Sequence, residues 1–152
     1  MVFIPRHPVI QNQFLVHDSA VSTTATAGCV VYLSGSEKVA CVTGTNTTPY
    51  GFLLQNVKAE SAAHPTGFRL PGDLGSSDAF TGDPVGVAHL GVYDTTNYAS
   101  AALPIAAGSD LYSTSAGQLT NSAGSGALGV KVAVAQNTVT TAGASLRVKI
   151  II

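Results

Sequence analysis

Residues with reactive side chains are few in this chain, and their spacing matches no catalytic or metal-binding pattern. The histidines are His7, His17, His64 and His89. No two of them have a zinc-type spacing, and neither cysteine has a nearby thiol or imidazole. The string His17-Asp18-Ser19 contains the residue types of a catalytic triad, but adjacent residues cannot adopt triad geometry. We therefore predict that the protein is not an enzyme and holds no metal or cofactor.

Three carboxylates are spaced by five residues in a stretch rich in Gly and Pro: Asp73, Asp78 and Asp83. A calcium loop would need a regular Asp/Asn/Gly pattern, which this stretch lacks. The strings Gly72-Asp73 and Gly82-Asp83-Pro84 are typical of turns. We interpret these carboxylates as turn residues in the longest loop, residues 59–83.

Cys29 and Cys41 lie in neighbouring predicted strands. A two-residue turn at Gly35-Ser36 would place the thiols on opposite faces, whereas a three-residue loop centred on Gly35 would place them directly across from each other. We expect small apolar core thiols, because the chain is expected to fold in the cytosol.

The chain is poor in charge. Of 152 residues only 10% are charged, with a net charge of −1, against about 25% in an ordinary globular protein. Such a surface should associate readily, so we expect other protein chains to cover much of it; a monomer covered by Ser and Thr is the alternative. The absence of a Lys/Arg cluster argues against nucleic-acid binding, and no apolar run is long enough to cross a membrane.

A motif occurs twice in the sequence. Ala27-Gly28-Cys29-Val30-Val31-Tyr32 returns as Ala107-Gly108-Ser109-Asp110-Leu111-Tyr112, at an offset of 80 residues, and Val39 corresponds to Leu119. Further along, Gly51 is matched with Gly129 at an offset of 78. The copies span about residues 27–57 and 107–135. Because the motif contains no shared reactive residue, it repeats packing and turns.

Short runs of β-branched and aromatic residues, separated by Gly, Pro and Asn, follow residue 28. This pattern predicts an all-β fold, either a β-sandwich or a small β-barrel, with residues 27–152 forming a single β-domain. The clearest strand is 146–152, where apolar residues alternate. Since an exposed edge of this composition would aggregate, we expect it to be paired on both sides or covered by a neighbour.

Residues 1–26 differ from the rest of the chain and predict an extended N-terminal arm, with a strand around 13–16. Pro5 and Pro8 favour an extended start. Two interpretations remain open: the arm docks on a neighbouring subunit, or it forms the first strand of the chain's own sheet. For the first, the expected contact residues are Phe3, Ile4, Val9, Ile10, Phe14 and Leu15.

The repeated residues resemble those of a known family. They are Gly28, Tyr32, Gly35 and Gly51, then Gly108, Tyr112, Gly117 and Gly129, with the strand Gly82–Val87 between the copies. Over about residues 27–135 this pattern is similar to the small all-β decoration, or cement, proteins of tailed-bacteriophage heads.

The resemblance implies a virion protein, assembled in the cytoplasm of a host bacterium. Such a protein would bind the outer surface of the capsid at capsomer junctions and stabilise the mature shell. Its implied partners are the major capsid protein and further copies of itself, as a homotrimer in preference to a dimer. The alternatives are another phage structural subunit, such as a tail tube or fibre protein, and a carbohydrate-binding β-sandwich. The absence of Trp speaks against the latter.

Overall fold

The computed structural model describes residues 3–5, 11–44, 47–59, 78–123 and 127–152. The elements are β1 (Phe3–Pro5), β2 (Gln11–His17), β3 (Val30–Gly35), β4 (Lys38–Cys41), β5 (Gly51–Leu53), β6 (Asn56–Lys58), β7 (Asp78–Phe80), β8 (Pro84–Thr95), the 3₁₀ turn η1 (Ser100–Ala102), β9 (Asp110–Thr114), β10 (Leu119–Thr120), β11 (Ala127–Ala135) and β12 (Leu146–Ile150). The predicted all-β fold is confirmed, and it is of the small-barrel kind.

Five strands close the first barrel in the order β2, β4, β3, β5, β8, with β8 returning to β2. Its interior is filled by aliphatic side chains that alternate along the strands. They include Leu15, Val31, Val39, Leu53, Val85 and Val87. This alternation is the period of two that the sequence shows in these runs, with one face of each strand turned to the core.

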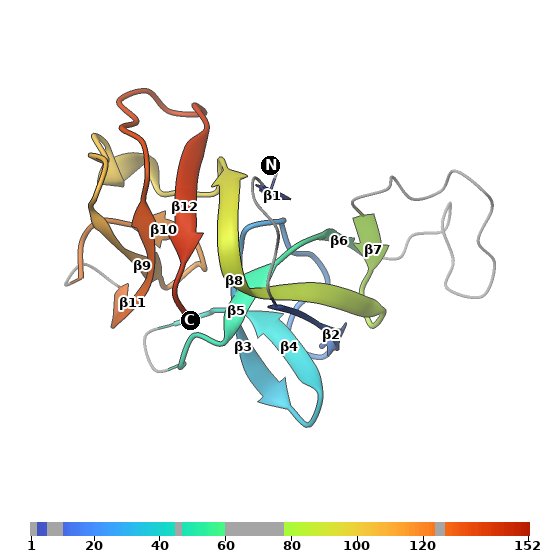
Figure 1. Ribbon diagram of the computed structural model, residues 1–152. Helices are drawn as coiled ribbons and strands as arrows, with labels where there is room; N and C mark the ends of the chain where they lie inside the picture. Colours follow the sequence, from blue (N-terminus) through green and yellow to red (C-terminus); the bar gives the residue numbers. More distant parts are fainter. Residues whose placement is uncertain (1–2, 6–10, 45–46, 60–77, 124–126) are drawn as a thin grey trace.

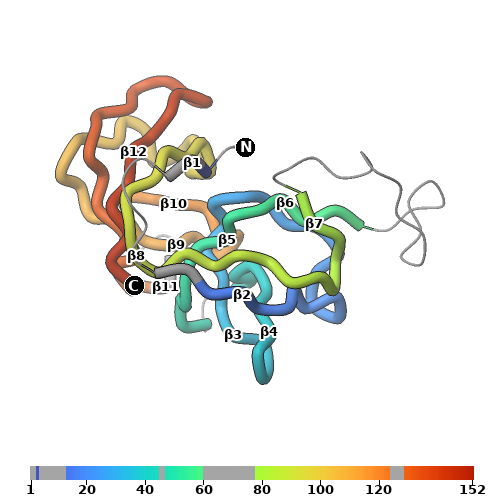
Figure 2. Tube along the Cα trace, turned by 45° about the vertical axis from the view of Figure 1, so that its right-hand side comes forward, coloured from blue at the N-terminus to red at the C-terminus, as the bar shows by residue number. Residues whose placement is uncertain are grey.

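The strand β8 is long and bent, and it passes from the first barrel into a second group of strands (Figures 1 and 2). Its second half pairs with β12, followed by β11, β9 and β10. A parallel bridge between Tyr98 and Leu119 closes this group into a second barrel. The terminal strand β12 is paired on both sides, by β11 and β8, as its apolar sequence predicts.

The two barrels are copies of one unit, down to individual hydrogen bonds. Gly28 N donates to Leu53 O at 2.7 Å, and Gly108 N donates to Ala135 O at 2.7 Å. Both glycines have left-handed φ values, 82° and 85°, which glycine adopts without steric penalty. The repeated Gly therefore marks the turn that enters the first hairpin of each barrel.

The correspondence extends to side chains that cap backbone groups. Ala27 N donates to Asn56 Oδ1, and Ala107 N donates to Thr138 Oγ1. A side chain also caps a backbone N–H of the strand that closes each barrel. Gly86 N donates to Gln55 Oε1, and Arg147 N donates to Asn137 Oδ1. Tyr32 lies opposite Ala40 and Tyr112 opposite Thr120, so the two tyrosines are also equivalent.

The predicted match between Gly51 and Gly129 is wrong. Gly51 lies opposite Val31, and the residue opposite the equivalent Leu111 is Ala133. The register of β11 shifts between Ala127 and Ala133, which separates Gly129 from the barrel position that Gly51 occupies. Similarity of short Gly-containing strings could not reveal this, because register is set by the hydrogen-bond ladder.

The described strands of residues 1–26 belong to the chain's own sheet, so they do not form a separate extended arm. β2 is a strand of the first barrel, and residues 18–26 continue from it to a bridge between Ala25 and Val57. β1 pairs with the second half of β8. The alternative interpretation, a strand of the chain's own sheet, is the correct one, because Leu15 fills the barrel interior. No boundary separates residues 11–26 from the following domain.

The barrels pack together through side chains that point out of the first one. Val30, Val42, Phe52 and Ala88 have no exposed surface and belong to the core cluster of the second barrel. Phe3 stacks on Tyr93 and Phe52, with ring centroids 4.4 Å and 5.7 Å away. The two barrels therefore share a continuous apolar junction.

Candidate functional site

The most exposed large apolar side chain among the described residues is Phe14, which is 75% exposed. It lies on β2 directly opposite Gly86 of β8, and Val16 lies opposite Pro84. Because Leu15, Val85 and Val87 point into the barrel, these four residues lie on its outer surface.

Leu54 completes this outer surface. A methyl group added to Gly86 would lie 2.9 Å from Leu54 Cδ1, so the Leu54 side chain covers the glycine. We call the surface formed by Phe14, Val16, Leu54, Pro84 and Gly86 the Phe14 face. None of these five residues is charged, and the exposed Lys38 of β4 borders them because it lies opposite Val16. Phe14 and Pro84 are exposed, Val16 and Leu54 are half-buried and Gly86 is buried.

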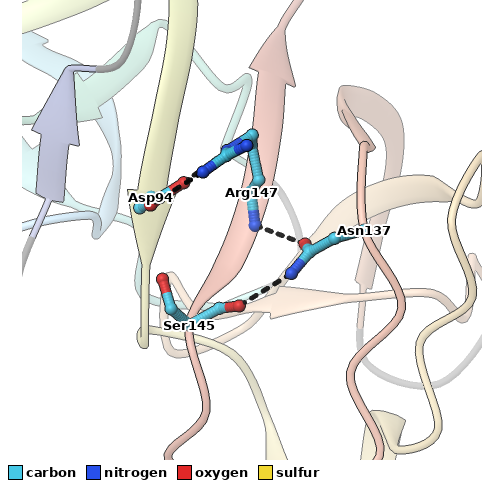
Figure 3. A network of polar contacts seen from close by, with 4 residues as sticks. All are labelled: Asp94, Asn137, Ser145 and Arg147. Atoms are coloured by element: carbon cyan, nitrogen blue, oxygen red, sulfur yellow. Dashed lines mark hydrogen bonds and ion pairs between the residues drawn. The ribbon is translucent and has the colours of Figure 1, made fainter.

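The equivalent positions of the second barrel carry polar side chains (Figure 3), of which Asp94 is 5% exposed. Asp94 corresponds to Phe14 and Arg147 to Gly86, since Asp94 and Arg147 lie opposite each other on β8 and β12. Arg147 Nε donates to Asp94 Oδ1 at 2.9 Å, and this hydrogen bond raises the pKa of Arg147. Asn137 Nδ2 donates to Ser145 O at 2.9 Å, which ties the neighbouring turn to the network.

A hollow of about 350 Å³ lies beside β3 and the segment before β5. It is lined by Tyr32, Leu33, Thr47, Thr48, Pro49 and Tyr50. Tyr50 is held in place, because its hydroxyl donates to Gln13 Oε1 at 2.7 Å and its ring meets His89 edge-on. Thr47 Oγ1 is buried without a hydrogen-bond partner.

The string His17-Asp18-Ser19 does not form a catalytic triad. Ser34 Oγ donates to Asp18 Oδ2 at 2.7 Å, and this hydrogen bond, followed by that from Ala20 N, lowers the pKa of Asp18. His17 is 1% exposed, and its Nδ1 lies 3.4 Å from Thr81 Oγ1.

Burial lowers the pKa of His17, which the Asp18 charge partly opposes. Because Ser34 contacts the carboxylate and not the imidazole, Ser34 and His17 do not form a nucleophile–base pair.

The carboxylates of the long loop have structural partners where they are described. Asp78 forms an ion pair with Lys58 across β6 and β7, and Asp83 Oδ2 accepts a hydrogen bond from Phe80 N. Asp73 lies outside the described residues. Within the part of the chain that the structure describes, no group of three His, Cys, Asp or Glu side chains could hold a metal ion.

Cys29 and Cys41 are joined as a disulfide, with Cα atoms 6.0 Å apart, so the expectation of free core thiols is wrong. Neither predicted turn is present. Gly35 lies opposite Lys38, and Val31 lies opposite Cys41. The turn therefore falls at Ser36-Glu37, one position later than expected, and the register shifts by one residue between Gly35 and Leu33. This shift puts Cys29 on the same face as Cys41, diagonally across the strand pair.

The six predicted contact residues of the N-terminal segment differ in their exposure to solvent. Phe3 and Leu15 are 7% and 5% exposed and belong to the core, so neither is available to a partner. Phe14 is 75% exposed, and its contact with a partner stays a prediction. Val9 and Ile10 lie outside the described residues, as does the side chain of Ile4. The sequence analysis missed Val16, Leu54, Pro84 and Gly86, although Pro84, Gly86 and Ala88 alternate with the core valines of β8.

Comparison with known proteins adds no relative. No family model matches the chain, and no curated protein matches it. In the described residues, no helix has the length and apolarity needed to span a membrane.

Proposed function

We propose that the protein is a non-enzymatic structural component of a bacteriophage head. In this role it binds the outside of the capsid at capsomer junctions, stabilises the mature shell and assembles with itself, as a trimer in preference to a dimer. Its partners are the major capsid protein and its own copies.

The character of the surface supports this proposal. A surface of 7265 Å² is shared by a chain with only 15 charged residues, where an ordinary protein of this length would carry about 38. Protein contacts of about 800 Å² on each partner can form on such a surface without burying unpaired ions. Binding to the mature shell alone would stabilise that state by mass action.

The observation that carries the proposal is the Phe14 face. Phe14 is 75% exposed and is flanked by the exposed Pro84 and the half-buried Val16 and Leu54, an arrangement that supports a contact with another protein. The two strands of this face belong to a closed barrel, so the surface is rigid and needs little ordering on binding.

The decisive experiment is mass spectrometry of purified phage particles, with the copy number measured relative to the shell subunit. The proposal requires a copy number in simple proportion to that of the shell subunit. A copy number typical of a tail tube or fibre would instead indicate a tail protein. Absence from particles would refute a structural role. Deletion of residues 2–16 cannot test capsid binding by the N-terminal segment, because it would remove β2, which is a strand of the first barrel.

The Tyr32–Tyr50 hollow favours a second candidate function, carbohydrate binding. Two tyrosines line the hollow and provide stacking surfaces for a sugar. Glycan-array binding that disappears in Tyr32→Ala would support this function. Binding that persists in Tyr32→Ala, or no binding at all, would remove it.

A further inference from the structure

The disulfide lies where the second barrel docks on the first. Gly117, in the turn between β9 and β10, packs directly against Cys29 Sγ. Gly117 O also accepts a hydrogen bond from Val30 N at 2.9 Å. The strand pair that Cys29 and Cys41 cross-link is therefore the docking surface for this turn.

A second hydrogen bond joins the same turn to the chain that follows the other strand. Gly44 N, three residues after Cys41, donates to Ser115 O at 2.9 Å. The turn thus binds one backbone donor just after each cysteine, Val30 N and Gly44 N. Because the disulfide limits the relative movement of these two donors, the turn binds both at a smaller entropic cost than it would without the disulfide.

Both cysteines line a hollow of about 470 Å³ that opens at the surface. Ala116 of the docked turn lines it as well, together with the exposed Thr24, Thr26 and Thr43. None of the described residues that line the hollow is charged. The hollow therefore gives a small charged thiol access to the disulfide without repulsion from its walls.

The two sulfur atoms differ in access. Cys29 is 3% exposed and Gly117 covers its sulfur, whereas Cys41 is half-buried. An incoming thiolate therefore attacks Cys41 Sγ, and Cys29 is the leaving group. Cys29 Sγ lies 3.4 Å from Val30 O, so the Cys29 thiol that forms on protonation has an acceptor for its weak hydrogen bond.

We propose that Cys29–Cys41 is a redox-controlled cross-link of the junction between the barrels, opened and closed by exchange with a small thiol at Cys41. In the opening direction the thiolate sulfur bonds to Cys41 Sγ, the bond between the two cysteines breaks, and the Cys29 thiolate takes up a proton. A second thiolate then attacks the sulfur of the bound small molecule. Cys41 leaves and takes up a proton, which gives two protein thiols and one small disulfide. Once the cross-link is open, the turn at residues 115–117 docks more weakly.

The proposed function gives the cross-link an order of events. Thiols in a bacterial cytoplasm are kept reduced, whereas a released particle meets an oxidising medium. The cross-link therefore closes after assembly and fixes the junction in the finished particle. Only this timing rests on the proposed function, because the exchange reaction needs nothing but the chain and a thiol.

Glutathione serves as the probe for the site of attack. The oxidised full chain is treated with reduced glutathione under native conditions and quenched with acid, and mass spectrometry then locates glutathione on the cysteine peptides. We expect it on Cys41. Glutathione on Cys29 would overturn the inference, as would reduction of the disulfide no faster than global unfolding.

Cys29→Ala and Cys41→Ala are matched variants, since each lacks the disulfide and keeps one thiol. With oxidised glutathione, Cys29→Ala should form the mixed disulfide at least about tenfold faster than Cys41→Ala, because Cys29 is covered in the folded chain. Equal rates in the two folded variants would contradict attack at Cys41. Circular dichroism checks that both are folded, and if either is not, the mapping on the unmodified chain decides.

Amide hydrogen exchange of the oxidised and the reduced chain tests the effect on the junction. We expect Val30 N–H and Gly44 N–H to exchange at least about tenfold faster after reduction, by local opening of the docked turn. The reference is the buried Ala135 N–H, which donates to Ser109 O at 2.9 Å within the second barrel. Unchanged exchange at Val30 and Gly44 would overturn the inference, and so would equal acceleration of Ala135, which would mean that reduction loosens the whole fold.

These results are independent of the proposed function. Both measurements use the purified chain without phage heads, so their failure leaves a structural role in the head untouched. Conversely, absence of the protein from particles would refute that role and leave the exchange at Cys41 as measured.

Discussion

Replacing the buried Gly117 with Ala should destabilise the protein more than the same replacement of Gly108, which lies in an open turn. Gly117 has a φ of 72° and lies in the turn between β9 and β10. This turn docks on the first barrel, where Gly117 O accepts a hydrogen bond from Val30 N at 2.9 Å. An added methyl group would overlap Cys29 Sγ and lie 3.1 Å from Val30 O.

The expected loss has two parts. A left-handed backbone with a side chain costs about 1–2 kcal/mol, and overpacking a buried contact costs about 1–3 kcal/mol. After the gain from restricting the unfolded chain, about 0.4–1 kcal/mol, the total is about 2–4 kcal/mol. For a protein of this size that corresponds to a fall in Tm of roughly 5–15 °C.

Two matched measurements separate these parts. Gly108→Ala has nearly the same φ, 85°, and nothing lies within 4 Å of the added methyl group, so only about 1 kcal/mol should be lost. In a Cys29→Ala background, Gly117→Ala should lose about 1–2 kcal/mol, because the overlap with sulfur is gone. Urea unfolding followed by circular dichroism, with the m value checked for constancy, measures all four free energies. Equal losses for Gly117→Ala and Gly108→Ala would refute the docked turn.

Three further predictions concern the first barrel. Glu37 occupies the position equivalent to Gly117 and has a φ of 56°. Glu37→Gly should therefore raise the free energy of unfolding by about 0.5–1 kcal/mol, measured by urea unfolding. A lower free energy of unfolding would contradict the strained turn. Burial lowers the pKa of His17, so the unfolded chain takes up a proton first as the pH falls below 6.5. The free energy of unfolding should then decrease by at most about 1.4 kcal/mol per pH unit, and this dependence should be missing between pH 7 and 5 in His17→Gln. The Asp18 pKa is lowered from 3.8, so its contribution is lost only at more acidic pH and does not confuse the measurement. Finally, Cys29 and Cys41 should resist alkylation without reductant, and Cys41→Ser should lower stability by about 3 kcal/mol; quantitative alkylation of the untreated folded protein would show that the thiols are free.

Most of the strands could be predicted from the sequence. The hairpin strands β3 and β4, the strands β8, β9 and β11, and the terminal β12 all lie where runs of alternating apolar residues indicate them. The first half of the repeat could also be predicted, because the Gly at positions 28 and 108 is required by a left-handed backbone in the same turn. These features depend on local conformation and on the period of two, which a linear sequence displays directly.

The errors arose where a conclusion required register. The register shift between Leu33 and Gly35 placed Cys29 and Cys41 on one face, and the irregularity in β11 moved Gly129 out of register with Gly51. Whether Phe14 or Leu15 is exposed likewise depends on which side of β2 faces the barrel interior. A shift of one residue exchanges the two faces of a strand, and nothing local to the strand decides it.

What the sequence by itself determined is the all-β character, the low charge and the repeated turn, because composition and short-range backbone preference are properties of the linear chain. What only the tertiary structure decided is that the two copies close into separate barrels joined by β8, and that one barrel exposes Phe14 where the other carries Asp94 and Arg147. The physical reason is that these facts depend on pairing between strands far apart in sequence, and such pairing fixes which side chains meet and which face solvent.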